Sequence, residues 1–195
     1  MKRVLASDDK QERRSYVAAP GLVATTSQDT QTPSQIARAV FHRIFNERDL
    51  SDPSAFWTDA SVDHFLAAGR TVRGATALAA WFEDLFAAVP DWHLEIENTV
   101  DDGDRQVVVQ WHATGTMTGA PFLGIEPNGR RIEIRAVDVI RLDEDGKVDS
   151  NTVYYDGAEF ARQVGMLPRR DSPLDRLSLN GFNTVTRLRR RMARK

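Results

Sequence analysis

The second half of the chain constrains the fold most, because apolar and polar residues alternate there in stretches separated by short turns. This alternation is typical of β-strands with one buried face. Turns rich in Asp and Gly are expected at 101–104 and 143–146, and Asn128-Gly129 favours a type I′ hairpin turn. We expect four strands, over residues 92–100, 105–118, 130–140 and 147–155.

The first half predicts helices and one short strand. Thr32-Pro33-Ser34-Gln35 is a capping box with proline at the first helical position, so a helix is expected from there to about residue 46. Helices segregated from an antiparallel sheet predict an α+β cone, in which a curved antiparallel or mixed sheet wraps around helices and leaves a central pocket. The other expected elements are a short helix over 53–57, a strand over 61–65, an amphipathic helix over 74–90 and a short last helix over 157–164.

Asp138 interrupts the apolar face of the strand over 130–140, which otherwise carries Ile132, Ile134, Ala136 and Ile140. A carboxylate that faces a core loses its hydration unless it is hydrogen-bonded or lies in a polar pocket. Burial also raises its pKa toward neutrality, where a general acid or base works best. Asp138 is therefore either a catalytic acid or base, or a structural carboxylate that pairs with an arginine or caps a loop.

Composition favours one globular domain with tails. The chain has 195 residues, of which 41% are hydrophobic and 28% charged, and its net charge of −2 argues against a whole-domain nucleic-acid binder. It contains no cysteine, which excludes disulfides and thiol catalysis. We expect a polar, partly disordered leader over residues 1–31, a domain over 32–168 and a basic extension over 169–195. No signal peptide or membrane span is evident in the sequence, so a cytoplasmic location is expected.

The extension over 169–195 carries nine Lys and Arg against two Asp. Leu174, Leu177, Leu188 and Met192 give it partial amphipathicity. A basic amphipathic segment suits an acidic partner, RNA or a membrane surface. Packing on a second subunit and a solvated tail are the alternatives.

Other candidate site residues follow from the same strand alternation. Asp63 and His64 are neighbours on one short strand, so only one of them faces the pocket; Asp63 is the choice, and a surface pair at the rim of the cone is the alternative. His64 and His112 are candidates for substrate binding, although the more polar strand face that carries His112 is also suited to the solvated exterior. Three further residues are expected in the pocket, as apolar wall or hydrogen-bond donor: Trp57, Phe82 and Tyr155.

Metal and cofactor motifs are missing from the sequence. The four histidines, at positions 42, 64, 93 and 112, show no paired ligand spacing. There is no glycine-rich phosphate loop and no nucleophile elbow. Any catalysis is therefore expected to be acid–base work without a cofactor or a metal.

Several motifs together resemble the SnoaL-like polyketide cyclase family of the NTF2-like superfamily. They span roughly residues 33–168, and the resemblance implies an NTF2-like cone and a homodimer. The matching pieces are Val-Asp-His at 62–64, Pro-Asp-Trp-His-Leu-Glu-Ile at 90–96, the stretch 114–131, Asp-Val-Ile-Arg-Leu at 138–142 with the following Asp-Gly-Lys-Val, and Tyr-Tyr-Asp-Gly at 154–157.

The resemblance also implies a chemistry, because the family's characterised cyclases perform a cofactor-independent intramolecular aldol condensation. Their acid/base Asp falls here on Val153, which cannot carry a proton, while the positions of its helpers fall on Ala136, Asp138 and Asp63. We therefore expect Asp138 to be the general acid or base, and Asp63 or Tyr155 to polarise the substrate oxygen. The expected reaction is a cyclisation, isomerisation or hydration of a polyketide-like or other apolar small molecule.

Two alternatives remain open. An epoxide hydrolase of the same superfamily is less expected, because Ala136 stands where its arginine would be. A non-catalytic cone that binds a ligand or a protein is the alternative from a different functional class.

Overall fold

The computed structural model describes residues 31–193, so the expected leader lies almost wholly outside the described residues. The helices are α1 (Pro33–Phe41), which continues as a π-helical turn (His42–Glu47), α2 (Ala75–Ala88), α3 (Gly157–Gln163) and α4 (Pro173–Met192). The strands are β1 (Trp57–Phe65), β2 (Arg70–Arg73), β3 (His93–Asp101), β4 (Gln106–Thr116), β5 (Arg131–Leu142) and β6 (Val148–Tyr155).

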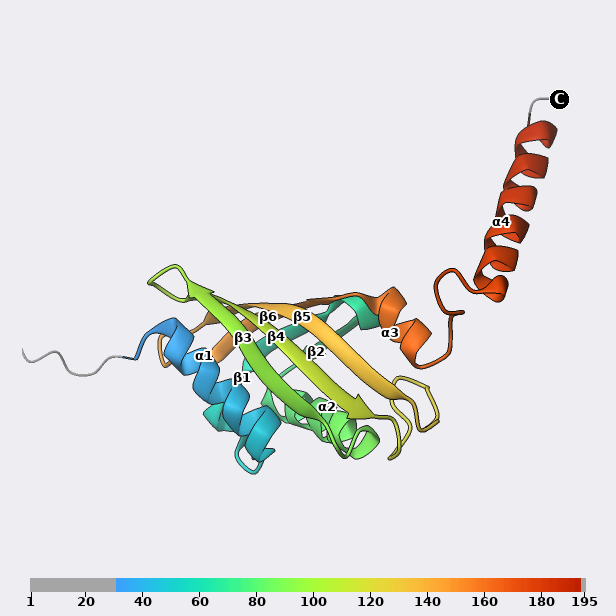
Figure 1. Ribbon diagram of the computed structural model, residues 1–195. Coiled ribbons are helices and arrows are strands. Elements are labelled where there is room, and N and C mark those ends of the chain that lie inside the picture. The colour runs from blue at the N-terminus through green and yellow to red at the C-terminus, as the bar shows by residue number, and fades with distance from the viewer. Residues whose placement is uncertain (1–30, 194–195) are drawn as a thin grey trace, which may run out of the picture. The chain divides into compact units, whose positions relative to one another are not determined.

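The strands form one six-stranded sheet in the order β2-β1-β6-β5-β4-β3. Strands β1 and β6 are parallel, and every other neighbouring pair is antiparallel. Figure 1 shows α1 and α2 on the same side of this curved sheet. The mixed sheet and its segregated helices confirm the expected α+β cone.

Two local predictions for the first half are wrong. The helix expected over 53–57 is only a 3-10 turn, Pro53–Ala55, and Trp57 instead opens β1 by pairing with Val148 of β6. Strand β2 was not expected; it forms because Gly69, with φ of 61°, turns the chain back so that β2 pairs antiparallel with β1. The start of β1 depends on pairing with the distant strand β6, and the four-residue strand β2 belongs to a short hairpin with β1 that no alternation in its sequence indicates.

Helices α1 and α2 are held against the sheet by their apolar faces. The capping box is present, because Thr32 Oγ1 accepts from the Gln35 amide at 3.2 Å and Gln35 Oε1 accepts from the Thr32 amide at 2.8 Å. Phe45, just after α1, meets Phe82 of α2 edge-on with ring centres 5.3 Å apart. Leu78, also on α2, is completely buried. The sheet thus has one covered face, and the candidate site lies on that side.

The connection from β4 to β5 is a long loop over 117–130 rather than a two-residue hairpin. The amides of Asn128 and Gly129 both donate to the Met117 carbonyl. Only Gly129 has a positive φ, of 69°, whereas a type I′ turn requires positive φ at both positions, so the predicted turn type is wrong. Asn128 instead uses its side chain to donate to the Val164 carbonyl at 3.0 Å, which ties the loop to the end of α3.

Helix α4 occupies most of the basic extension. Ser172 caps it by accepting from the Asp175 amide at 3.2 Å. Its apolar side chains are exposed, including Leu177, at 66%, and Phe182, at 68%. Among residues 31–193, no helix is both long and apolar enough to cross a membrane.

Candidate active site

An apolar cavity opens on the covered face of the sheet. Its total empty volume is about 730 Å³ when the part open to solvent is included. The volume that the centre of a water-sized sphere can occupy is only about 80 Å³. The wall is mainly aromatic and aliphatic, with Phe82, Trp111 and Met117 among its members. Asp138 is the only charged side chain among the described residues that line it.

The loop over 117–130 closes part of this cavity. Phe122 and Leu123 of the loop line the cavity, and the Phe122 ring packs against Trp81 with centres 5.3 Å apart. Gly119 anchors the loop to the end of α2 because its amide donates to the Ala88 carbonyl at 3.0 Å. A Cβ at position 119 would lie 1.8 Å from the carbonyl oxygen of residue 87, so this close approach requires glycine.

Asp138 lies on β5, directly between Val109 of β4 and Val153 of β6 in the register of the sheet. Its side chain points inward, as the alternation predicts, and it is 4% exposed. Oδ1 accepts from Trp111 Nε1 at 2.8 Å, and Oδ2 accepts from Asn151 Nδ2 at 2.9 Å. Because both donors are neutral, the carboxyl group gains hydrogen bonds without a compensating positive charge.

A second buried carboxyl group lies beside it. Asp63 is 2% exposed on β1 and pairs in register with Asn151 of β6. Asn151 Nδ2 is 3.4 Å from Asp63 Oδ2, so one amide group bridges Asp63 and Asp138. Among the described residues, Asp63 Oδ1 and Asn151 Oδ1 have no hydrogen-bond partner.

Burial raises the pKa of both carboxyl groups. The pKa of Asp138 is raised to about 6, against the opposing effect of its hydrogen bonds from Trp111 and Asn151. The pKa of Asp63 is raised to about 7 by burial, opposed by the hydrogen bond from Asn151 and increased by the nearby charge of Asp138. The two groups titrate as a pair, and the two hydrogen bonds that Asp138 accepts, against the single longer one to Asp63, favour Asp138 as the ionised member.

Two hydrogen-bond donors line the same cavity. Tyr155 pairs in register with Ala136 on β5, and burial raises the pKa of its hydroxyl, so it remains a donor. Trp92 has a buried Nε1 that finds no acceptor among residues 31–193. These donors are suited to a polar atom of a bound molecule.

The remaining predicted residues divide between the inside and the outside of the cone. Phe82 lines the cavity, whereas Trp57 lies behind it, stacked on Phe82 with ring centres 5.7 Å apart, and does not line it. Neither His64 nor His112 lines the cavity. His64 alternates with the inward-facing Asp63, and its Nδ1 lies 3.0 Å from Thr71 Oγ1 on the edge strand β2.

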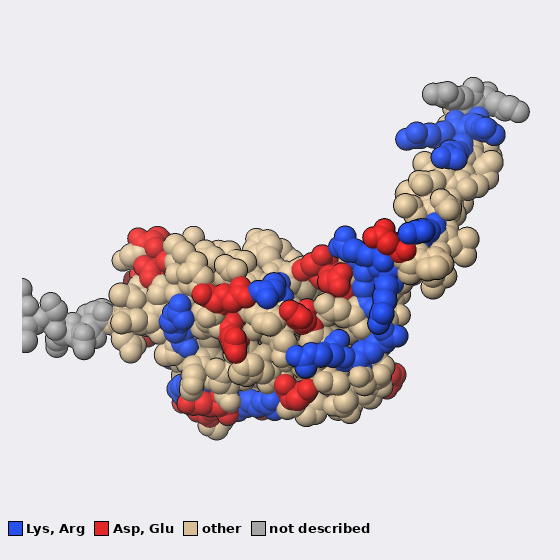
Figure 2. Space-filling view, in the orientation of Figure 1, with Lys and Arg blue, Asp and Glu red and all other residues tan. Residues whose placement is uncertain are grey.

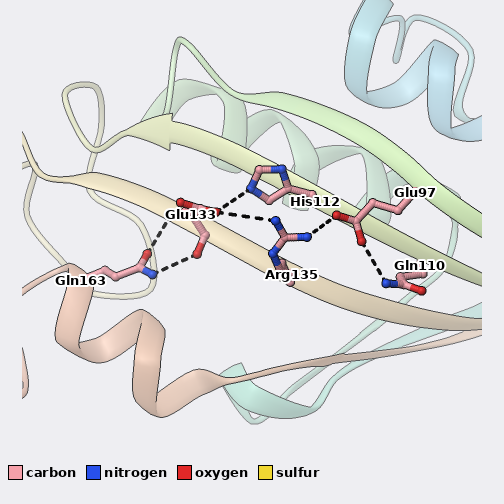
Figure 3. Close-up of polar contacts among 6 residues, drawn as sticks. All are labelled: Glu97, Gln110, His112, Glu133, Arg135 and Gln163. Carbon is pink, nitrogen blue, oxygen red and sulfur yellow. Dashed lines mark hydrogen bonds and ion pairs between the residues drawn. The ribbon is translucent and has the colours of Figure 1, made fainter. Parts of the chain in front are cut away.

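His112 belongs to a charged network on the outer face of the sheet, drawn in Figure 3. Its Nε2 lies 3.1 Å from Glu133 Oε1, and Arg135 forms an ion pair with Glu97 on the same face. Gln163 of α3 exchanges two hydrogen bonds with the backbone of Glu133. The structure thus brings Asp138, Phe82 and Tyr155 into one cavity, links Asp63 to Asp138 from behind the cavity wall through Asn151, and separates both histidines from them.

Two polar members of the site were missed by the sequence analysis. Asn151 alternates with Val153 and Tyr155 on one face of β6, so the strand pattern contained the signal. Trp111 carries no such signal in the sequence, because its donation to Asp138 depends on a contact between two strands. Within residues 31–193, no group of His, Asp and Glu side chains is arranged to hold a metal ion.

Comparisons with known proteins identify the fold. The structure superposes on AclR from Streptomyces galilaeus, described as a candidate hydroxylase, with a TM-score of 0.59 and 21% identity over 82% of this chain and 96% of that one. TsrD from Streptomyces laurentii superposes with a TM-score of 0.59 and 24% identity, over 69% of this chain and 96% of that one. A SnoaL-like polyketide cyclase from Agrobacterium tumefaciens superposes with a TM-score of 0.57 and 20% identity, over 70% of this chain and 100% of that one. At these identities the likeness shows the fold alone.

The sequence itself places the chain in a family. A search of curated proteins found no match. The sequence profile of the SnoaL-like polyketide cyclases matches residues 35–164, a range that contains the whole sheet, the cavity and both buried carboxyl groups. The chain therefore belongs to the SnoaL-like polyketide cyclase family.

Proposed function

We propose that this protein is a cofactor-independent acid–base enzyme of the cyclase type, acting on a small apolar carbonyl compound. The observation that carries the proposal is the buried carboxyl group of Asp138, which lines an otherwise apolar cavity. Its raised pKa, about 6, suits a general base that must hold a proton briefly near neutral pH. Membership of the SnoaL-like family supports an enzymatic role of this kind.

The proposed chemistry begins with removal of a proton from the carbon beside a substrate carbonyl. Asp138 accepts this proton, and the hydroxyl of Tyr155 donates a hydrogen bond to the developing enolate oxygen. The enolate carbon then attacks a second carbonyl carbon of the same molecule, or is protonated again at another carbon to give an isomer. In the first case Asp138 returns its proton to the new alkoxide oxygen, so the atoms balance and no co-reactant is needed.

Asp63 acts in this scheme as a positioning residue. It is not among the residues that line the cavity, and it reaches Asp138 through the Asn151 amide. A protonated Asp63 adds no negative charge beside Asp138, so Asp138 can ionise alone. The expected role of Asp63 in polarising the substrate therefore passes, in our proposal, to Tyr155.

The register of the sheet supports the transfer of the acid/base role to Asp138. The family position that falls on Val153 lies directly opposite Asp138 on the neighbouring strand, and both side chains line the cavity. A carboxyl group moved from one strand to the other therefore still faces the same space. A family member with valine at that position therefore retains a base in the cavity.

The size of the cavity limits the proposed substrate. Small-molecule sites typically enclose roughly 300–1,000 Å³, and the inner room here is about 80 Å³. A substrate with several fused rings would require movement of Phe122 and Leu123. We therefore propose a compact one- or two-ring substrate, with the larger polyketides as the less favoured case.

The test uses proton abstraction directly, because it does not require the natural substrate to be known. The protein is incubated in D₂O with a panel of small aromatic and cyclic ketones, and deuterium entering the carbon beside the carbonyl is followed by NMR. Polyketide esters, enones and epoxides are screened in parallel for products. We expect exchange or turnover with the wild type and its loss in Asp138→Asn. The matched control is Glu133→Gln, the same change of a carboxylate to an amide on the same strand but on the outer face.

A non-catalytic ligand-binding cone is the second candidate, and the narrow cavity is the observation that favours it. If no panel member exchanges or reacts, but some raise the melting temperature of both wild type and Asp138→Asn, the enzymatic proposal fails and the binding function replaces it. The homodimer, the cytoplasmic location and the contact of the basic C-terminal helix with an acidic partner remain proposals. Light scattering of the full chain in solution tests the first of them.

A further inference from the structure

A groove rich in arginine lies where α3 leaves the sheet. Figure 2 shows Lys and Arg side chains gathered in this region, beside the start of the C-terminal helix. The groove measures about 330 Å³. Five arginines line it: Arg130, Arg131, Arg162, Arg169 and Arg170.

The positive charge of this groove is largely uncompensated. Of the five arginines, only Arg170 forms ion pairs within the described part of the chain, with Asp156 and Glu159, both at 3.6 Å. Glu159 is the single acidic residue among those that line the groove. The Nε and Nη1 atoms of Arg162 are buried and find no hydrogen-bond acceptor among residues 31–193. Arg162 as a whole is half-buried, and a guanidinium group that is partly withdrawn from water without an acceptor favours a negative charge beside it.

Backbone and loop contacts hold one part of the groove, around Arg130, in place. A Cβ at Gly165, where φ is +85°, would lie 2.7 Å from Arg130 Cζ, so the guanidinium of Arg130 lies directly over the glycine. Asn128 accepts from the Arg130 amide at 3.1 Å and donates to the Val164 carbonyl at 3.0 Å. These contacts fix the start of β5 against the end of α3 and so hold Arg130 near Arg162.

We propose that this groove binds the phosphate group of a phosphorylated small molecule. Guanidinium groups present planar sets of N–H donors that match the oxygens of phosphate. Five arginines with one glutamate require more than one negative charge, which a phosphate monoester supplies near neutral pH and a single carboxylate does not. The inference stands independently of the proposed function, because Asp138 and the arginines line different spaces.

Titration calorimetry with the full chain tests this inference, using inorganic pyrophosphate as the probe at a constant ionic strength set with NaCl. We expect saturable binding and a rise in melting temperature that acetate at the same ionic strength does not produce. Arg162→Gln and Arg130→Gln should each weaken pyrophosphate binding about tenfold, the effect of losing a charge-assisted hydrogen bond. Arg162→Lys, which keeps the charge but loses the planar set of donors, should fall between them and the wild type.

The control variant is Arg190→Gln, which removes one positive charge from α4 outside the groove and should leave pyrophosphate binding unchanged. Equal weakening by Arg190→Gln and Arg162→Gln would overturn the inference, because it would indicate general attraction to a basic protein. No binding beyond that of acetate would overturn it as well. Vesicles of phosphatidylcholine with phosphatidic acid are a second probe: binding to vesicles without binding to pyrophosphate would assign the phosphate to a lipid headgroup and reject the small-molecule source.

Discussion

The two faces of the same pair of strands, β4 and β5, show how position decides what a carboxyl group can do. On the inner face, Asp138 is buried, and its two hydrogen-bond donors, Trp111 and Asn151, are neutral. On the outer face, three residues further toward the start of β5, Arg135 pairs with Glu97 and lies near Glu133. The inner carboxyl group keeps a raised pKa near neutrality because nothing positive compensates its burial.

Asp138 is therefore suited to acid–base chemistry not only because it is buried in the cavity, but also because no arginine among the described residues lies beside it there to hold it in the charged form. Ion pairs at the surface hold carboxylates in their charged form and are screened by solvent. On the inner face, the neighbouring acid is Asp63, and the group between Asp63 and Asp138 is the neutral side-chain amide of Asn151 rather than a positive charge.

Replacing the inner carboxyl group should remove the chemistry. Asp138→Asn is expected to lower proton exchange or turnover by roughly 10²–10⁴-fold, the usual contribution of a general acid or base. The variant should still fold, because an amide at position 138 can accept from Trp111 and donate to a turned Asn151. Rates and circular dichroism of Asp138→Asn and Glu133→Gln are compared. An equal fall in rate in both variants would contradict the claim that only the carboxyl group on the inner face takes part in the chemistry.

Removing the second buried acid should stabilise the protein at high pH. The pKa of Asp63 rises from 3.8 to about 7 on folding, so the folded state binds the proton more tightly, and stability falls as pH rises from about 4 through 7. Asp63→Asn lacks this loss. Its free energy of unfolding should match that of the wild type near pH 4 and exceed it above pH 7 by on the order of 4 kcal/mol.

Urea unfolding at pH 4 and pH 8 measures this effect in the wild type and Asp63→Asn. A difference in the free energy of unfolding that stays constant between the two pH values would show that Asp63 ionises normally. The Glu133→Gln variant serves again as the outer-face comparison.

Weakening the hydrogen bonds to Asp138 should move its pKa in a known direction. The bond from Trp111 Nε1 opposes the effect of burial, so Trp111→Phe should raise the pKa of Asp138 further. The acidic limb of the pH–rate profile should shift to higher pH with it. A profile that shifts to lower pH, or that does not shift while the rate falls, would contradict the assignment of this limb to Asp138.

Changes to the outer face should have the smallest effect. Arg135→Gln removes the pair with Glu97 and is expected to change the free energy of unfolding by no more than about 0.5 kcal/mol, less at high salt. Catalysis should be unaffected, because Arg135 does not line the cavity. Denaturant unfolding at low and high NaCl, with the exchange assay, checks both statements.

Much of the fold was predictable because its signals are local. The capping box at Thr32 and the alternation in β4 and β5 each depend on neighbouring residues only. The start of β1 at Trp57 was not predictable in this way, since it depends on pairing with the distant strand β6, and the short strand β2 carries no alternation of its own. The Asn128-Gly129 turn failed because Asn128 is used for a contact with Val164.

The candidate site was predictable in part for the same reason. Alternation placed Asp138 inside and allowed only one of Asp63 and His64 to face the pocket, and it contained the signal for Asn151 as well. It did not show that one amide joins the two acids, that Trp111 donates to Asp138, or that Trp57 lies one layer behind Phe82. Those facts depend on which strands are neighbours and on side-chain direction, and they decide the chemistry.

The most direct test of the account is the titration of the Asp138 carboxyl group itself. Protein labelled with ¹³C in its aspartate side chains is followed by NMR from pH 3 to pH 9, and the Asp138 resonance is assigned by its absence in Asp138→Asn. The account predicts a midpoint near 6. A midpoint at or below about 4, the ordinary value for aspartate, would show that burial does not raise the pKa of Asp138. That result would contradict the role of Asp138 as the base of this cavity.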